Sequence, residues 1–225
     1  MKVIAEGGIN HMGDLQLARI LANRSKRAGA DIVKFQTFWN LGRLKKYELT
    51  RSTHLTLKKY CYEIGIEFMS TPHTLDAIDF LDSLVKMHKV ASPFLTNKEF
   101  IMRVDEMAKP ILLSTGSLQH ENGMATFDEI KTTLDWIKHS EVTLMHCCSK
   151  YPCKEPHYER IDELRKEFNL PVGLSDHSQN IKIDVDVPYL EKHIMLHHVN
   201  SIDKAVSLYP EEFKEMVKYV KKERN

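Results

Sequence analysis

The sequence predicts a (β/α)8 barrel of the TIM type. Short runs with the composition of buried strands alternate with longer segments whose apolar residues recur at helical spacing, and this alternation is typical of parallel α/β folds. Eight such runs occur, and neither a linker nor a low-complexity segment separates them. We therefore expect one domain over residues 1–225, with an open doubly wound sheet as the alternative to a closed barrel.

The candidate strands are short, mostly apolar, and bounded by turn or helix signals. They cover residues 3–9, 31–37, 67–72, 88–92, 110–115, 143–149, 172–177 and 189–196. Helical spacing is clearest at 15–21, 75–84 and 125–139. Pro210 followed by Glu211 is a good first turn, so the last helix is expected at about 210–223.

This barrel must have shorter helices or loops than is usual, because such folds typically need about 250 residues. Only residues 178–188 separate the seventh strand from the eighth. A parallel crossover that contains a full helix usually takes a dozen residues or more. We therefore expect the seventh crossover helix to be one or two turns long, or absent.

Composition excludes several classes of function. The net charge of +1 argues against a nucleic-acid binder, and no apolar run approaches the roughly 20 residues that span a bilayer. Glu6 interrupts the apolar start where a signal peptide would continue, so we expect a cytoplasmic protein. The four cysteines lack C-x-x-C spacing and are interpreted as small buried residues in a reducing compartment, with a zinc cluster as the weaker alternative.

Two histidines close neighbouring strand candidates. Side chains alternate along a strand, so His177 shares a face with Ser175, and His193 shares a face with Glu191. If the two strands are neighbours, the two imidazoles and the Glu191 carboxylate converge at one rim and form a plausible divalent-metal site, with the Ser175 hydroxyl beside it. The histidines at 54, 73, 120, 139 and 157 lie in loops or helical stretches and are interpreted as surface residues.

Other polar residues also gather at the carboxyl ends of the strands, where barrel enzymes place their active sites. Lys34 lies within a buried strand, so its ammonium needs an anionic ligand or a carboxylate partner, and an ion pair with Glu6 is the purely structural explanation. Lys89, Ser114 and several further hydroxyls end other strands. Two lysines with hydroxyls around one mouth favour an anionic ligand that carries phosphate and carboxylate groups.

At this point the sequence resembles the sialic acid synthase family, which condenses phosphoenolpyruvate with an N-acetylated amino sugar. The motifs that carry the resemblance occur in the family's order along nearly the whole chain. They are AEGGINHMGD at 5–14, GADIVKFQT at 29–37, EFMSTP at 67–72, KVAS at 89–92, LSTG at 113–116, HCCSKYP at 146–152, GLSDH at 173–177, EKH at 191–193 and SLYPEEF at 207–213.

The resemblance implies a role for each matching residue. His177 and His193 match the metal ligands, with Mn²⁺ as the expected ion and Mg²⁺ or Co²⁺ as alternatives. Lys34 and six further residues match the phosphoenolpyruvate site; the six are Thr71, Lys89, Ser92, Ser114, Ser149 and Ser175. Glu6, Tyr151 and Asp203 match residues near the sugar or the reacting centre. Of this set, Glu6, Lys34 and Asp203 are the expected catalytic residues.

The sequence departs from the family pattern at two places. After the Lys-x-Ala-Ser motif, family members usually carry glycine and then an acid that has been linked to the sugar, whereas here Pro93 and Phe94 follow. The chain also ends at Asn225, so we expect a short form that lacks the family's C-terminal antifreeze-like domain. Lys89 and Ser92 have opposite strand parity, and a bulge or a strand end near Ser92 must bring both inward.

Three hypotheses remain open from the sequence. The first is a metal-dependent enzyme that joins phosphoenolpyruvate to an amino sugar and releases phosphate. The second is a degenerate barrel that binds metal and phosphoenolpyruvate without turnover. The third is a pyruvate aldolase with a Schiff-base lysine at Lys34 or Lys89. The acceptor sugar and the oligomeric state are open, with a homodimer as one option.

Overall fold

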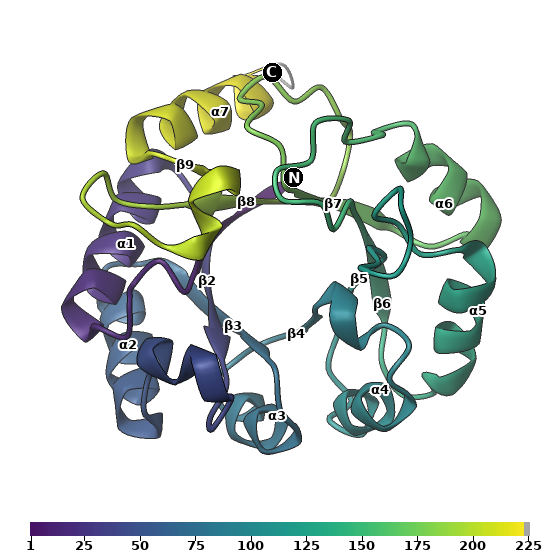
Figure 1. Cartoon of the computed structure of the whole chain (residues 1–225), viewed down its shortest axis with the longest axis horizontal. Coiled ribbons are helices and arrows are strands. Elements are labelled where there is room, and N and C mark those ends of the chain that lie inside the picture. Colours follow the sequence, from purple (N-terminus) through teal and green to yellow (C-terminus); the bar gives the residue numbers. More distant parts are fainter. Residues whose placement is uncertain (223–225) are drawn as a thin grey trace.

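A ring of parallel strands forms where the sequence carries its short apolar runs (Figure 1). The computed structural model describes residues 1–222. The strands of the ring are β1 (Lys2–Gly8), β2 (Ile32–Thr37), β3 (Glu67–Pro72), β4 (His88–Val90), β5 (Ile111–Ser114), β6 (Val142–Cys147), β7 (Val172–Asp176) and β8 (Tyr189–Ile194). Their pairing follows the order β3-β2-β1-β8-β7-β6-β5-β4, and β3 and β4 at its two ends lie side by side. The predicted barrel is confirmed.

Helices surround the ring and begin at recognisable sequence signals. They are α1 (Leu15–Ala28), α2 (Arg51–Glu63), α3 (Leu75–Asp82), α4 (Lys98–Asp105), α5 (Phe127–Trp136), α6 (Arg160–Phe168) and α7 (Pro210–Lys222). The Asp14 side chain accepts hydrogen bonds from the first backbone N–H groups of α1, and Thr126 forms a capping box with Glu129 in α5. Short 3-10 helices η1 (Gly42–Tyr47), η2 (Ser92–Phe94) and η3 (Ile202–Val206) lie in the connections, and β9 (Ser207–Leu208) pairs with β8.

The barrel interior is apolar at the amino ends of the strands and polar at their carboxyl ends. Six buried apolar residues fill the layer nearest the amino ends of the strands. A polar or thiol residue follows each of them two positions later in the chain, on the same face. The six pairs are Ile4 and Glu6, Ile32 and Lys34, Met69 and Thr71, Met87 and Lys89, Leu112 and Ser114, and Met145 and Cys147. The layered filling typical of these barrels thus ends in a polar layer.

The seventh crossover contains no helix anywhere between β7 and β8, a segment that the structure describes throughout, and this confirms the expectation from its length. Its apolar residues alternate instead of following helical spacing. Ile183 and Val187 are each 2% exposed, while Ile181 and Val185 are half-buried and pack on the same core. An extended segment with every second side chain turned inward therefore covers this part of the barrel wall.

The parity conflict between Lys89 and Ser92 is resolved by a strand end. β4 ends at Val90, two residues earlier than expected, and Ser92 is the first residue of η2. Lys89 therefore reaches the interior from the strand, and Ser92 reaches it from the 3-10 turn.

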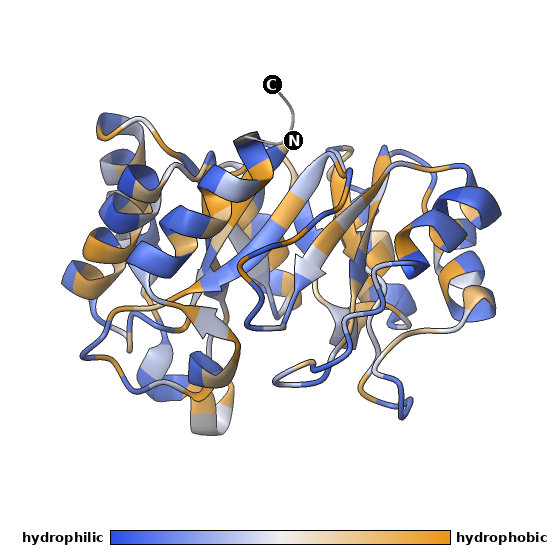
Figure 2. Ribbon diagram, turned by 90° about the horizontal axis from the view of Figure 1, so that it is seen from above, coloured by the Kyte–Doolittle hydropathy of each residue, from blue (hydrophilic) through white to orange (hydrophobic). Residues whose placement is uncertain are grey.

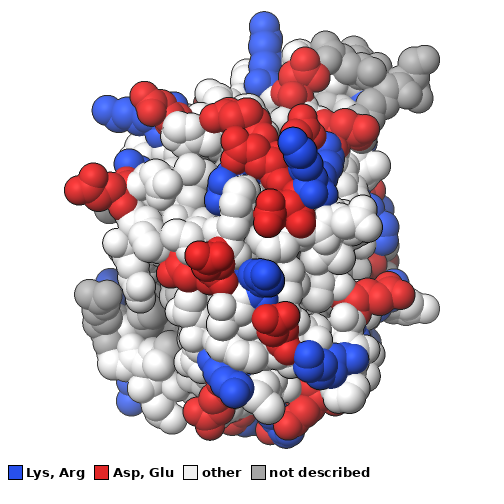
Figure 3. All heavy atoms as spheres, turned by 90° about the vertical axis from the view of Figure 1, so that its right-hand side faces the viewer, with Lys and Arg blue, Asp and Glu red and all other residues white. Residues whose placement is uncertain are grey.

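The outer surface carries mixed charge. Each helix presents both hydrophobic and hydrophilic residues (Figure 2), as expected for helices that cover a sheet. On the side formed by α5 and α6, acidic and basic side chains are interspersed (Figure 3). None of the helices within residues 1–222 has the length and apolarity that a membrane span requires.

Candidate active site

One pocket opens at the carboxyl ends of the strands, and it gathers nearly all the residues singled out in the sequence. Its lining includes Glu6, Lys34, Thr71, Lys89, Ser92, Ser114, Ser149, Tyr151, Ser175, His177 and His193. Asp203 lies just outside the lining. It sits on η3, and a Cβ atom added at Gly8 would be 2.9 Å from its Oδ2 and 3.4 Å from Glu6 Oε1. The structure therefore brings the expected site residues of all eight strands and of η3 to one end of the barrel.

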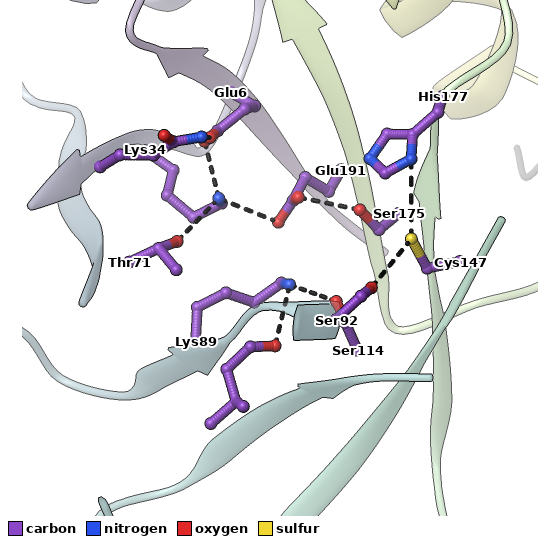
Figure 4. A network of polar contacts seen from close by, with 12 residues as sticks. Glu6, Lys34, Thr71, Lys89, Ser92, Ser114, Cys147, Ser175, His177 and Glu191 are labelled. Atoms are coloured by element: carbon purple, nitrogen blue, oxygen red, sulfur yellow. Dashed lines mark hydrogen bonds and ion pairs between the residues drawn. The ribbon is translucent and has the colours of Figure 1, made fainter. Parts of the chain in front are cut away.

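Lys34 is held by two carboxylates (Figure 4). Its Nζ atom lies 2.7 Å from Glu6 Oε2 and 3.6 Å from Glu191 Oε2, and it donates a hydrogen bond of 3.0 Å to Thr71 Oγ1. Glu6 and Lys34 are register partners on β1 and β2, so the ion pair considered from the sequence is present. Burial alone would lower the pKa of Lys34, but the two carboxylates outweigh burial and raise it, so the ammonium stays charged.

Lys89 has a different environment. Its ammonium donates to Ser114 Oγ and, at 3.4 Å, to the carbonyl oxygen of Val90. Among the described residues 1–222, no carboxylate lies within ion-pair distance of Lys89, although its side chain is buried and burial lowers its pKa. A buried ammonium with only neutral partners is costly, so this position favours an anionic ligand.

Small residues and hydroxyls leave space beside Lys89. A Cβ atom at Gly116 would lie 2.2 Å from Ser149 Oγ and 2.6 Å from Ser92 Oγ, so only glycine fits between these two hydroxyls. Ser149 Oγ is buried and has no hydrogen-bond partner within residues 1–222. Two hydroxyls that converge on a glycine next to a buried lysine can accommodate the oxygens of a phosphate group.

The two histidines face each other across β7 and β8. Their ring centroids are 5.3 Å apart. His177 Nδ1 lies 2.8 Å from the Cys148 carbonyl oxygen, and a carbonyl can only accept, so Nδ1 carries a proton. The other ring nitrogen, Nε2, lies 3.2 Å from the Tyr151 hydroxyl at the pocket. His193 Nδ1 is buried without a hydrogen-bond partner in the described part of the chain. The two imidazoles could supply two ligands to a divalent cation, and the described residues hold no cluster of three or more His, Cys, Asp or Glu side chains that could bind one.

Three carboxyl groups near the histidines differ in protonation. Burial raises the pKa of Glu6 to about 7, against the opposing effect of Lys34, and burial also raises the pKa of Asp203. Burial would raise the pKa of Glu191 as well, but Lys34 and Lys89 outweigh burial and lower it. Glu191 therefore stays anionic, whereas Glu6 can hold a proton near neutral pH.

Seven residues of the pocket lining were not assigned a role from the sequence, and four of them carry polar or thiol side chains. Strand parity with His193 had placed one of the four, Glu191, at the rim, and its side chain lines the pocket. Cys147 occupies the inward polar layer on β6, so strand parity with Ser149 could have indicated it. Cys147 had been interpreted as apolar filling. Its Sγ atom lies 3.5 Å from Ser92 Oγ and 3.6 Å from His177 Nδ1. Gln36 and His73 also line the pocket.

Two histidines expected on the surface lie elsewhere. His54 is fully buried on α2, where it contacts Thr37 Oγ1 at 2.7 Å and the Thr50 carbonyl oxygen at 2.9 Å. His73 is half-buried at the pocket. The surface interpretation was wrong for both, because a histidine in a helix or loop can be buried once its nitrogens find partners.

Comparisons with known proteins agree with the geometry. The NeuB family model matches residues 39–225. An N,N'-diacetyllegionaminic acid synthase from Legionella pneumophila is 32% identical, over 97% of this chain and 71% of its own length. The human N-acetylneuraminate-9-phosphate synthase is 28% identical, over 97% of this chain and 69% of its own length.

A solved structure gives the same result at the level of the fold. The N-acetylneuraminic acid synthetase from Leptospira borgpetersenii superimposes with a TM-score of 0.90 at 28% identity, covering 99% of this chain and 83% of the solved one. The family that the sequence motifs resemble is thereby confirmed: this chain belongs to the NeuB family of sugar acid synthases.

Proposed function

We propose that this chain condenses phosphoenolpyruvate with the aldehyde of an N-acetylated amino sugar, forming a nonulosonic acid and releasing inorganic phosphate. The observation that carries the proposal is a single pocket with two buried lysines beside paired hydroxyls and two facing histidines. Phosphoenolpyruvate has two anionic groups, and two separated cations match such a ligand. The relatives named above are synthases of related sugar acids, which supports the same class of product.

The two lysines suit different groups of this substrate. Lys89 lacks a carboxylate partner and lies beside Ser92 and Ser149, so we assign it the phosphate group. Lys34 is already partly neutralised by anionic Glu191 and donates to Thr71, so we assign it the weaker charge of the carboxylate. With the phosphate at Lys89 and the carboxylate at Lys34, the enol carbon would lie between the two lysines.

The carboxyl groups divide the proton chemistry. Attack of the enol carbon on the aldehyde leaves an oxygen that must gain a proton, and Glu6 can supply it because its pKa is raised to about 7. The cationic centre formed at the former enol carbon then takes up water before phosphate leaves by C–O cleavage. Glu191 remains anionic and can stabilise that positive charge. None of these steps requires a covalent bond to the protein.

His177 and His193 would hold a divalent cation, for which we propose Mn²⁺, with Mg²⁺ or Co²⁺ as alternatives. Bound there, the cation would polarise the aldehyde oxygen of the acceptor. The hydrogen bond from His177 Nδ1 to the Cys148 carbonyl oxygen fixes the ring orientation that such a ligand needs.

Release of phosphate from phosphoenolpyruvate, with Mn²⁺ and a panel of N-acetylated amino sugars, tests the proposal. We expect release that depends on one class of acceptor and that falls at least about 100-fold in Lys89→Met, which removes the charge at nearly constant volume. The matched control is Lys59→Met on α2, where the lysine side chain is 79% exposed. Absence of release with every acceptor would refute the proposal.

One observation favours the second candidate, a barrel that binds without turnover. Phe94 stands where the family usually has an acid, and its ring stacks on Phe100 with 4.1 Å between centroids. Calorimetric binding of phosphoenolpyruvate without phosphate release would support this candidate. The aldolase alternative predicts a borohydride-trapped pyruvate adduct, and the charged state of Lys34 disfavours it at that position.

A further inference from the structure

Asp176 and Lys192 are buried charged residues that the proposed chemistry does not use. Their side chains are 0% exposed, and Lys192 Nζ lies 2.6 Å from Asp176 Oδ2. Ser175 and Glu191, one position earlier on each strand, line the pocket. Because strand side chains alternate, the ion pair lies on the outer face of the barrel wall, behind the pocket.

The β7–β8 crossover contributes no helix to cover the outer face at this point in the described structure, although α6 packs against β7. On β1, β2 and β5, outward positions such as Ala5, Val33 and Leu113 are apolar and belong to the core between sheet and helices. On β7 and β8, by contrast, the outward positions 176 and 192 carry charged side chains that form an ion pair.

The same pair holds the backbone on both sides of His177. The Ser178 N–H donates to Asp176 Oδ1 at 3.1 Å, and Ser178 Oγ donates to Asp176 Oδ2 at 2.8 Å. Lys192 Nζ also donates to the carbonyl oxygen of Ser178. The neighbours of His177 are thereby tied to each other and to β8, and the Cys153 N–H holds the His177 carbonyl oxygen at 3.0 Å.

The strand register also places the Asp176–Lys192 ion pair next to His193. Asp176 and Lys192 are register partners, one position beyond the pair formed by Ser175 and Glu191. His193 follows Lys192 in the chain, so each histidine is covalently adjacent to one member of the ion pair.

We propose that the Asp176–Lys192 ion pair and Ser178 position His177 and His193 at the separation that a divalent cation needs; this inference rests on the proposed function. A buried ion pair is rarely more stable than apolar residues of similar volume, because both charges lose their hydration. Its directional contacts nevertheless fix a geometry that apolar packing would leave looser. Asp176, Ser178 and Lys192 are thus positioning residues for the metal ligands.

Positioning differs measurably from a simple electrostatic effect. Asp176→Asn leaves the Lys192 ammonium uncompensated and would repel a cation, whereas Lys192→Met leaves the Asp176 carboxylate and would attract one. If the pair acted only through its charges, the two substitutions would change cation affinity in opposite directions. If the pair positions the imidazoles, both substitutions weaken binding, and so does the double variant.

The experiment measures binding of Mn²⁺ alone to the metal-free protein, by loss of the free-ion signal in electron paramagnetic resonance. We expect the dissociation constant to rise at least about tenfold in Asp176→Asn, Lys192→Met and the double variant. Asp105→Asn is the matched control, because Asp105 is equally buried but accepts backbone hydrogen bonds from 138–140, away from the pocket. Binding of phosphoenolpyruvate without metal, which depends on Lys34 and Lys89, should be unchanged in all variants.

Each outcome is decisive. Unchanged Mn²⁺ affinity in folded variants, or changes of opposite sign in the two single variants, would overturn the inference and leave the proposed function intact. Failure of the native protein to bind Mn²⁺ would overturn the metal part of the proposed function together with the inference. If the charged-residue variants do not fold, Ser178→Ala removes only the hydroxyl, and we expect a loss of a few-fold; unchanged affinity there would overturn the inference.

Discussion

The raised pKa of Glu6 predicts that this carboxyl destabilises the metal-free fold as the pH rises. In the unfolded chain a glutamate titrates near 4.5, whereas in the fold burial raises the pKa of Glu6 to about 7. Below pH 4.5 the group is protonated in both states. Between pH 4.5 and about 7 only the unfolded chain loses the proton, so the free energy of unfolding falls as the pH rises. Above about pH 7 the carboxyl is ionised in both states, and the free energy of unfolding falls no further on its account.

The magnitude follows from that difference. At about 1.4 kcal/mol for each pH unit, a separation between 4.5 and about 7 corresponds to about 3 kcal/mol. Glu6→Gln cannot ionise, so its free energy of unfolding, relative to that of the native chain, should increase by about 2–3 kcal/mol from pH 5 to pH 8. The ion pair with Lys34 forms only when Glu6 is ionised, and its effect is already contained in the pKa of about 7, so it adds no separate contribution.

Urea unfolding of the native chain and of Glu6→Gln, at several pH values and in the presence of a chelator, measures the difference between their free energies of unfolding. Glu67→Gln is the matched control, since Glu67 pairs with exposed Lys86 at the other end of the barrel, and we expect its difference to stay constant. A constant difference for Glu6→Gln as well would show that Glu6 is ionised throughout, and would remove it as the proton donor.

Three further predictions follow from the geometry. Gly116→Ala should raise the KM for phosphoenolpyruvate about tenfold or more, because the new methyl group displaces the hydroxyls of Ser92 and Ser149; an unchanged KM would argue against a phosphate site there. His193→Ala should abolish Mn²⁺ binding measured by calorimetry, and retention of native affinity would contradict the assigned ligand pair. Ile183→Ala should lower the free energy of unfolding by about 2–4 kcal/mol in urea titrations without changing the KM, since the side chain is 2% exposed and does not line the pocket; a loss below about 0.5 kcal/mol would show that the crossover is loosely packed.

The sequence predicted the barrel well because its signals are local. The alternation of strand and helix patterns, the Pro210 helix start and the short 178–188 crossover each depend on neighbouring residues. The polar residues at the strand ends could also be recognised from the sequence, and strand parity turned most of them towards the interior of the barrel, where they line one pocket.

What the sequence did not indicate depends on contacts between distant segments. Strand parity turns Cys147 towards the barrel interior, but only the fold places its thiol beside Ser92 and His177. The burial of His54 depends on Thr37 from another element. The contacts of Lys192 with Asp176 and Ser178 likewise become apparent only when β7 and β8 pair, because the partners come from separate segments of the chain.

The fate of the bridging oxygen of phosphoenolpyruvate tests the central claim most directly. When phosphoenolpyruvate labelled with ¹⁸O at the bridge is incubated with the protein, Mn²⁺ and a reactive amino sugar, mass spectrometry should find the label in the released phosphate, because condensation breaks the C–O bond. Unlabelled phosphate would mean that the P–O bond breaks instead, as in simple hydrolysis, and would contradict the account.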